Sequence, residues 1–451
     1  MSESDFAKRL MSGWLDLLRL LPAADFPDDT IEEIVHRHAE QASDHIRRLH
    51  RGGHRSLEEL AIRGEGLLPS TIAELAVGAG MPLDPPPPQA QLPMSQLAPG
   101  HLLDYEWYFT PSTRETLATR VSSTAPTSVL LLGCPSLVAP LADRGLRVVL
   151  VDQSTHGLSL FGARRGHSVT LISSDIGVSG IDIAVRDAIA EPVPSMAMDK
   201  WGEDPQEDDP HSVETVLGRY DAVVLDPPWY PEYYVRWLEV ALRCVRPGAR
   251  IYFVAPSRFV RPTSQIEGLA LHAALQQCGR VRELGRAIRY ATPLFESDAL
   301  QSLGFDPHIA WRSAELIELV VDEPSIANAF GSALDRWSTN HREPSRKWSE
   351  VQIAGQYVKF DAELTDRPTQ PPVLLPLPSL ADFVLPSVSR RVMERHGAAI
   401  WTSRNRVART TDLVEMRRVL RQMDRMSQGE AEYFLTSRRP LDGSLETLLF
   451  R

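Results

Sequence analysis

The sequence predicts an α/β fold, in which a mostly parallel β-sheet is covered by helices on both faces. Three short, largely apolar runs support the prediction, and they lie at residues 129–132, 147–151 and 222–225. Continuous apolar runs of this length are typical of parallel strands, because such strands are buried on both faces. Helical periodicity lies between and after these runs, as expected for strands joined by helical crossovers.

The first two runs, with the segment that joins them, predict one βαβ unit at residues 128–154. Gly133-Cys134-Pro135 turns the chain after the first strand, a short helix follows, and the second strand ends in Asp152. An acid at the tip of the second strand of a Rossmann-like unit is placed to accept hydrogen bonds from ribose hydroxyls. An ordinary βαβ unit, whose second strand often ends in a polar residue, is the alternative.

The turn after the first strand also bears on the choice of nucleotide. It carries one glycine, Gly133, where a dinucleotide-binding turn has the G-x-G-x-x-G pattern that lets a pyrophosphate approach the backbone. S-adenosylmethionine has no phosphate and can be held without that pattern. The turn therefore favours S-adenosylmethionine over NAD or FAD.

The third apolar run ends directly in Asp226-Pro227-Pro228-Trp229, which Tyr230 follows. The two prolines fix φ and remove two N–H donors, so the chain leaves the strand in one rigid conformation. The Asp226 carboxylate and the Pro227 carbonyl can then accept hydrogen bonds from one amino group. Trp229 would form a flat wall beside that group, and Trp229 or Tyr230 would stack on a base. A strand-ending turn with a proline pair is the alternative.

Downstream residues predict the rest of the sheet. Helices are expected at residues 232–245 and 265–278, around a strand at residues 249–257. Residues 288–297 and 314–322 are expected to form the antiparallel terminal strands of a seven-stranded sheet.

Three stretches also carry a likeness to a known family. They are the aromatic segment EWYFTPSTRETLATRV at residues 106–121, the turn LLGCPSLV at residues 131–138, and DPPW at residues 226–229. Together they resemble class I methyltransferases that methylate amino groups, above all the N6-adenine methyltransferase-like family. The likeness covers residues 104–322 and implies the Rossmann-like class I sheet, with S-adenosylmethionine as cofactor.

The resemblance implies a role for each candidate residue. The catalytic residues are Asp226, Pro227, Pro228 and Trp229. The cofactor-binding residues are Gly133, Cys134, Pro135, Asp152 and Asp187. The substrate-binding residues are Trp107, Tyr108, Tyr230 and Phe295, and Tyr290 and Glu296 are further residues that could shape the substrate side. Asp175 competes with Asp187 for the adenine amino group of the cofactor, a surface turn is an equal alternative for both, and core packing is the alternative for Phe295.

Composition sets limits on partners and compartment. The chain has 451 residues, 43% of them hydrophobic, and a net charge of −11. Its three cysteines, Cys134, Cys244 and Cys278, show no C-x-x-C spacing, so neither a disulfide framework nor a metal site is expected. No apolar stretch is long enough for a membrane helix, and the first residues lack a signal-peptide pattern. We therefore expect a cytoplasmic protein with no membrane contact.

The flanks of the α/β region predict further domains, since a chain of this length exceeds one ordinary domain. Helical periodicity comes first, and the proline-rich run MPLDPPPPQAQLP at residues 81–93 then favours an extended linker. The predicted divisions are a helical domain at residues 1–81, a linker at 82–100, a methyltransferase domain at 101–325 and a C-terminal accessory or substrate-recognition region at 326–451. The last is expected to be a smaller α or α+β domain.

Three functions fit these patterns. The leading one is methyl transfer to an exocyclic amino group, with N6 of adenine in DNA or RNA as the acceptor. Protein-lysine methylation is the second, because the net negative charge is unusual for a protein that binds a phosphate backbone. The third is a non-catalytic binding protein that keeps the fold.

Overall fold

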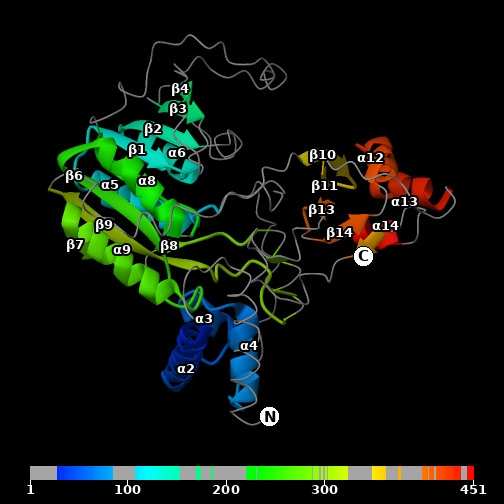
Figure 1. Ribbon diagram of the computed structural model, residues 1–451, viewed down its shortest axis with the longest axis horizontal. Coiled ribbons are helices and arrows are strands. Elements are labelled where there is room, and N and C mark those ends of the chain that lie inside the picture. Colours follow the sequence, from blue (N-terminus) through cyan, green and yellow to red (C-terminus); the bar gives the residue numbers. More distant parts are fainter. Residues whose placement is uncertain are drawn as a thin grey trace. The chain divides into compact units, whose positions relative to one another are not determined.

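The computed structural model describes sixteen stretches of the chain, and all structural statements below concern these residues. They are 28–84, 107–152, 169–173, 184–185, 220–229, 231–286, 288–293, 296–297, 300–301, 303–322, 348–361, 374–376, 399–404, 406–410, 413–437 and 444–450. The chain divides into two compact units. Figure 1 labels their helices and strands. One comprises Glu106–Ala291 and Arg312–Asn340; the other comprises Met1–Tyr105, Thr292–Trp311 and His341–Arg451.

The first unit is built on a mixed sheet that contains nine of the described strands. Its strand order is β4-β3-β2-β1-β5-β6-β9-β7, and β8 pairs with β9 beside β7. The strands are β1 (Ser128–Leu132), β2 (Arg147–Asp152), β3 (Val169–Ser173), β4 (Ala184–Val185), β5 (Tyr220–Leu225), β6 (Val245–Pro256), β7 (Gly279–Glu283), β8 (Ile288–Arg289) and β9 (Ser313–Val321). β3, β2, β1, β5 and β6 run parallel, and β9 lies antiparallel to β6 and β7.

This topology confirms the predicted fold class. The path β3-β2-β1-β5-β6-β9-β7 is the Rossmann-like seven-stranded sheet of class I methyltransferases. From β1 the chain first builds outward through β2 and β3, then returns to the other side of β1 with β5 and β6. The strand order therefore reverses between β1 and β5. In open α/β sheets, ligands bind beyond the carboxyl ends of the strands at such a switch point.

Two apolar clusters lie on opposite faces of the sheet, because side chains along a strand alternate between faces. Leu130 and Leu132 of β1 belong to one cluster, with α8 (Pro231–Arg243) and α9 (Ser264–Cys278). The alternate residues, Val129 and Leu131, belong to the other, with α5 (Pro111–Ser122), the 3-10 turn η1 (Pro135–Leu137) and α6 (Val138–Ala142). Burial of both faces explains the continuous apolar runs at residues 129–132 of β1 and 222–225 of β5.

One predicted strand is wrong. Residues 288–297 were expected to form an antiparallel terminal strand, but β8 covers only Ile288–Arg289, and β7 at Gly279–Glu283 takes the outer place beside β9. β7 has the sequence GRVRE, of which only Val281 packs against the core. An edge strand this polar leaves almost no apolar pattern to detect. The expected strand at residues 314–322 is confirmed as β9.

The second unit contains a helical N-terminal part. Its described helices are α2 (Asp28–Arg51), α3 (Leu57–Arg63) and α4 (Pro69–Gly78). Buried side chains of all three, among them Ile46, Leu60 and Ile72, provide its core. The Ser56 side chain caps α3 by accepting a hydrogen bond from the backbone of Glu59, which is a strong helix-start signal.

The C-terminal part of the second unit is α+β. An antiparallel sheet has the order β10-β11-β13-β14-β12, and three helices follow it. The elements are β10 (Trp348–Ile353), β11 (Gln356–Asp361), β12 (Leu374–Pro376), β13 (Ile400–Thr402), β14 (Val407–Thr410), α12 (Leu413–Gln422), α13 (Gln428–Ser437) and α14 (Ser444–Phe450). The sheet and helices share one apolar core that includes Phe360, Ile400, Leu420 and Leu448.

Two features concern the described ranges as a whole. No helix within them is long and apolar enough to cross a bilayer. Within the same ranges, no group of three or more His, Cys, Asp or Glu residues could hold a metal ion. None of the three cysteines is in a disulfide, and all three are buried.

Candidate active site

Three predicted site residues lie at the carboxyl ends of the neighbouring parallel strands β2, β1 and β5, at and beside the switch point. Gly133 follows β1 and donates its N–H to the carbonyl of Val151 at 3.0 Å. Asp152 is the last residue of β2. Asp226 follows β5 and donates its backbone N–H to the carbonyl of Leu132 at 3.3 Å. The two candidate loops are thus tied by the backbone to neighbouring strands.

Both the backbone conformation and the neighbouring side chain require a glycine at position 133. Its φ is +62°, a region that favours glycine. A Cβ atom there would lie 2.5 Å from Cη2 of Trp237, a residue of α8. The next residue, Cys134, is buried, and its Sγ lies 3.3 Å from the Leu132 carbonyl. The turn after β1 therefore packs directly on the helix that follows the DPPW loop.

Asp152 occupies the position expected for a cofactor-binding acid. Its side chain is 5% exposed, and the residue pairs in register with Ser173 of β3. A buried carboxyl at the tip of this strand can accept hydrogen bonds from vicinal hydroxyls. Asp187 and its competitor Asp175 lie outside the described residues, so both remain predictions.

Asp226 is half-buried, and its carboxyl has a specific partner. Oδ1 accepts a hydrogen bond from the Tyr290 hydroxyl at 2.8 Å. Burial raises the pKa of Asp226 to about 8, although the hydrogen bond from Tyr290 opposes the rise. A carboxyl with such a pKa exists in both protonation states near neutral pH, and a nearby positive charge would favour the ionised form.

Tyr290 stands at the centre of an aromatic group. It is 2% exposed, and its ring centroid lies 5.3 Å from that of Phe109, 5.6 Å from Trp229 and 6.4 Å from Trp107. Burial and the charge of Asp226 raise the pKa of Tyr290 well above its ordinary value. The phenol therefore keeps its proton and acts as the donor.

The aromatic segment before the first strand brings Tyr290 to this place. Phe109 and Tyr290 form an isolated antiparallel bridge, and the Tyr108 carbonyl accepts a hydrogen bond from the Ala291 N–H at 2.8 Å. Trp107 is half-buried, and the Arg312 guanidinium lies 4.0 Å from its ring centroid. Trp107 and the Asp226 carboxyl thus both contact Tyr290, whereas the side chain of Tyr108 is buried.

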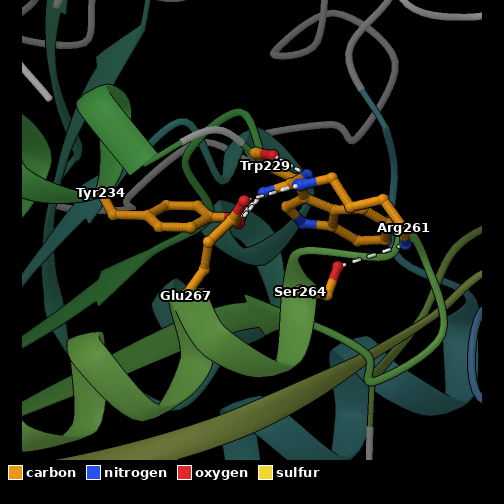
Figure 2. A network of polar contacts seen from close by, with 5 residues as sticks. All are labelled: Trp229, Tyr234, Arg261, Ser264 and Glu267. Atoms are coloured by element: carbon orange, nitrogen blue, oxygen red, sulfur yellow. Dashed lines mark hydrogen bonds and ion pairs between the residues drawn. The ribbon is translucent and has the colours of Figure 1, made fainter. Parts of the chain in front are cut away.

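The DPPW loop, residues 226–229, has a further side-chain contact at its last residue. Pro227 is buried, Pro228 is exposed and Trp229 is half-buried. The Trp229 carbonyl accepts a hydrogen bond from the guanidinium of Arg261, which also pairs with Glu267 (Figure 2).

Of the other three substrate-side candidates, the structure describes Glu296 alone. Tyr230 and Phe295 lie outside the described residues. Glu296 is 1% exposed, and its carboxyl accepts a hydrogen bond from Trp311 Nε1 at 3.2 Å. Arg261 and Glu267 had no place in the sequence-based site. Their only signal is a pair of opposite charges six residues apart, across the start of a predicted helix.

Comparisons with known proteins give structural likeness only. No protein-family model and no curated protein sequence matches the chain. A mutein of the branched-chain polyamine synthase from Thermus thermophilus is similar at 15% identity, with 72% of this chain and 95% of that chain covered and a TM-score of 0.44. The structure of that mutein is a complex with N4-aminopropylspermidine and 5'-methylthioadenosine.

Two methyltransferases are similar over a smaller share of the chain. A putative O-methyltransferase from Klebsiella pneumoniae has 14% identity, covers 47% of this chain and 81% of that chain, and has a TM-score of 0.26. The O-methyltransferase from Bacillus cereus, in complex with S-adenosylhomocysteine, also has 14% identity, with coverages of 49% and 84% and a TM-score of 0.28. The fold assignment rests on the strand order of the sheet.

Proposed function

We propose that the chain is an S-adenosylmethionine-dependent N-methyltransferase that acts on an exocyclic amino group, with N6 of adenine in nucleic acid as the acceptor. One observation carries the proposal. The half-buried Asp226 carboxyl, held by Tyr290, lies at the switch point of a class I sheet and begins the rigid DPPW loop.

The loops after β1 and β2 suit S-adenosylmethionine. Asp152 is buried at the tip of β2, where ribose hydroxyls would meet it. The turn at Gly133-Cys134-Pro135 packs tightly on Trp237 and has no glycine-rich approach for a pyrophosphate. A donor without phosphates fits these residues better than a dinucleotide does. Asp187 is proposed to contact the cofactor adenine.

Asp226 and Pro227 would hold the acceptor nitrogen. S-adenosylmethionine supplies a methyl group that is already electrophilic, and the nitrogen lone pair displaces the neutral thioether as the N–C bond forms. Positioning can contribute up to about 7–11 kcal/mol to such a step. Hydrogen bonds to the Asp226 carboxylate and the Pro227 carbonyl would orient the amino group and expose its lone pair. The methylated nitrogen then loses one proton, and a carboxylate with a pKa of about 8 can accept it.

The aromatic side chains favour a planar acceptor. Trp229 is half-buried and follows Asp226 by three residues, and both Trp229 and Trp107 pack edge-on against Tyr290. An adenine could stack on either indole, and an adenine in a duplex would first have to be flipped out. A lysine side chain could use the same acceptors, but it would first have to lose a proton.

The test is a labelling experiment with the full chain. The wild-type protein and the Asp226→Asn variant are incubated with tritiated S-adenosylmethionine and cell lysate, then treated with DNase, RNase or protease. We expect macromolecular label that a nuclease releases, and none with Asp226→Asn, which should still bind S-adenosylhomocysteine in calorimetry.

Each other result contradicts the proposal in its own way. Label released only by protease would identify a protein acceptor, such as lysine. Label found from the start in the low-molecular-mass fraction would identify a small acceptor, such as an amine. No label with the wild-type chain would favour a binding protein, and full turnover by Asp226→Asn would refute the role of the carboxylate.

A further inference from the structure

A buried guanidinium contacts the last residue of the DPPW loop. Arg261 is 8% exposed and sits in the turn between β6 and α9. One terminal nitrogen, Nη1, donates to the Trp229 carbonyl, and Nη2 lies 3.5 Å from the Tyr234 hydroxyl. Figure 2 shows the side chain reaching from its own turn to Trp229 and Glu267.

Glu267 also holds the guanidinium, through two of its nitrogens. Nε of Arg261 donates to Oε1 of Glu267 at 3.2 Å, and Nη2 pairs with Oε2, so the contact is bidentate. The side chains are 9% and 12% exposed, and the ion pair raises the pKa of Arg261. The backbone N–H of Arg261 donates to Ser264 Oγ at 3.2 Å, which ties the turn to the first residue of α9. A bidentate pair sets the plane of a guanidinium as well as its place.

The bond to Trp229 lies at the end of a continuous series of contacts. Pro227 and Pro228 have no N–H, so these two residues cannot donate backbone hydrogen bonds that would tie the loop to its surroundings. The Trp229 ring packs edge-on against Tyr290, whose hydroxyl holds Asp226. Glu267, Arg261, Trp229, Tyr290 and Asp226 are thereby connected without a gap.

We propose that Arg261 is a positioning residue that acts through the Trp229 carbonyl. It sets the place of the Trp229 ring, and hence of the wall beside the Asp226 carboxyl, while Glu267 holds the guanidinium in its plane. The inference deepens the proposed function, on which it rests for what the loop would hold.

The experiment follows the Trp229 ring itself. Protein labelled with 5-fluorotryptophan is studied by ¹⁹F NMR, and the Trp229→Phe variant assigns the resonance. The test variants are Arg261→Lys, which keeps the charge but loses the planar fork, and Glu267→Gln, which keeps the shape but loses the ion pair. Arg250→Lys is the matched control, because Arg250 pairs with Glu318 at 2.6 Å between β6 and β9.

We expect the Trp229 resonance to shift or broaden in both test variants and to stay unchanged in Arg250→Lys. The Kd for S-adenosylhomocysteine should change less than about twofold, while the transfer rate falls up to about a hundredfold, as for a small displacement of a reacting group. The NMR readout needs no acceptor, so it stands even if the acceptor class is wrong.

Four outcomes decide the inference. An unmoved resonance in both test variants overturns it, and so does an equal change in the control. A change in Arg261→Lys alone supports Arg261 and removes the part given to Glu267. Should Arg261→Lys fail to fold, Glu267→Gln decides, because it retains the guanidinium.

Discussion

The Tyr290 hydroxyl donates a 2.8 Å hydrogen bond to Oδ1 of Asp226 and so joins the segment after β8 to the loop after β5. Because burial and the neighbouring charge raise the pKa of Tyr290 well above its ordinary value, the phenol keeps its proton and donates a hydrogen bond to the ionised carboxylate. One oxygen of Asp226 is therefore held in a set orientation. This arrangement makes the protonation of Asp226 the most informative property of the site.

Tyr290→Phe should slow methyl transfer and move its pH dependence to higher pH. The hydrogen bond from Tyr290 lowers the pKa of Asp226, so its loss raises that pKa above about 8. A hydrogen bond to a charged group contributes about 1.5–3 kcal/mol, which corresponds to a roughly tenfold to hundredfold loss in rate at neutral pH. The measurement is the transfer rate from pH 6 to 10, chosen to bracket the expected pKa by about two units on either side.

Tyr252→Phe is the control for that experiment. Tyr252 is fully buried in the same apolar cluster as Tyr290, but it lies on β6, and Asp226 is not among the groups that shift the pKa of its hydroxyl. The Tyr252→Phe substitution should leave the pH dependence of the transfer rate unchanged. Identical profiles for wild type and Tyr290→Phe would show that the hydroxyl does not tune Asp226.

The affinity for S-adenosylmethionine should increase as the pH rises through about 8. The ionised form of Asp226 predominates above its pKa, and a bound sulfonium favours that form. By linkage, a cation that lowers the pKa by about one unit binds about tenfold more tightly to the ionised site. S-adenosylhomocysteine has an uncharged sulfur, so its affinity should stay level.

Calorimetry with both ligands at pH 7 and pH 9, about one unit below and above the expected pKa, measures the difference. Asp226→Asn provides the internal control, since an amide does not titrate and the dependence should vanish. An equal pH dependence for the two ligands would place the sulfur away from Asp226.

The strands that carry the site could be predicted because their local pattern is unambiguous. Residues 129–132 of β1 and 222–225 of β5 are buried on both faces and are therefore continuous apolar runs, and their ends locate Gly133 and Asp226. β7 could not be found in this way, since a polar edge strand is defined by its pairing with β9 rather than by its own pattern. Which strands form the edges of the β-sheet depends on the tertiary fold and not on the local sequence.

The hydrogen-bond partners of the predicted site residues could not be predicted from the sequence. Tyr290 is 64 residues from Asp226 in the sequence, and no local periodicity selects one hydroxyl for one carboxyl. The contact arises because the segment at Trp107–Phe109 pairs with residues 289–291 and carries Tyr290 to the end of β5. Arg261 is similar, since its target is a backbone carbonyl and a carbonyl has no sequence signature.

Asp152→Ala should weaken cofactor binding without a direct effect on the transfer step. The buried carboxyl at the tip of β2 is proposed to hold the ribose hydroxyls, and such bonds contribute about 1.5–3 kcal/mol. The Kd for S-adenosylhomocysteine should therefore rise roughly tenfold to hundredfold in calorimetry. With saturating donor, the transfer rate should recover, whereas Asp226→Asn should show the reverse pattern. An unchanged Kd would remove Asp152 from the cofactor site.

Gly133→Ala should destabilise the protein more than Gly145→Ala and should also weaken cofactor binding. Both glycines have positive φ, +62° and +78°, so both substitutions incur a backbone strain of about 1–2 kcal/mol. Gly145 has open space where a Cβ would stand, whereas at Gly133 that atom would meet the Trp237 ring at 2.5 Å. Displacement of a packed ring adds about 1–3 kcal/mol.

Urea unfolding of the two variants isolates this extra term, because the backbone strain is common to both. Trp237 lies on α8, which begins two residues after Trp229, so its displacement should also disturb the DPPW loop. The turn at Gly133-Cys134-Pro135 is itself proposed to hold the cofactor, so we expect a lower affinity for S-adenosylhomocysteine in Gly133→Ala alone. Equal losses of stability in the two variants would mean that the Trp237 side chain moves aside without a cost in free energy. The turn after β1 would then not affect the DPPW loop through Trp237.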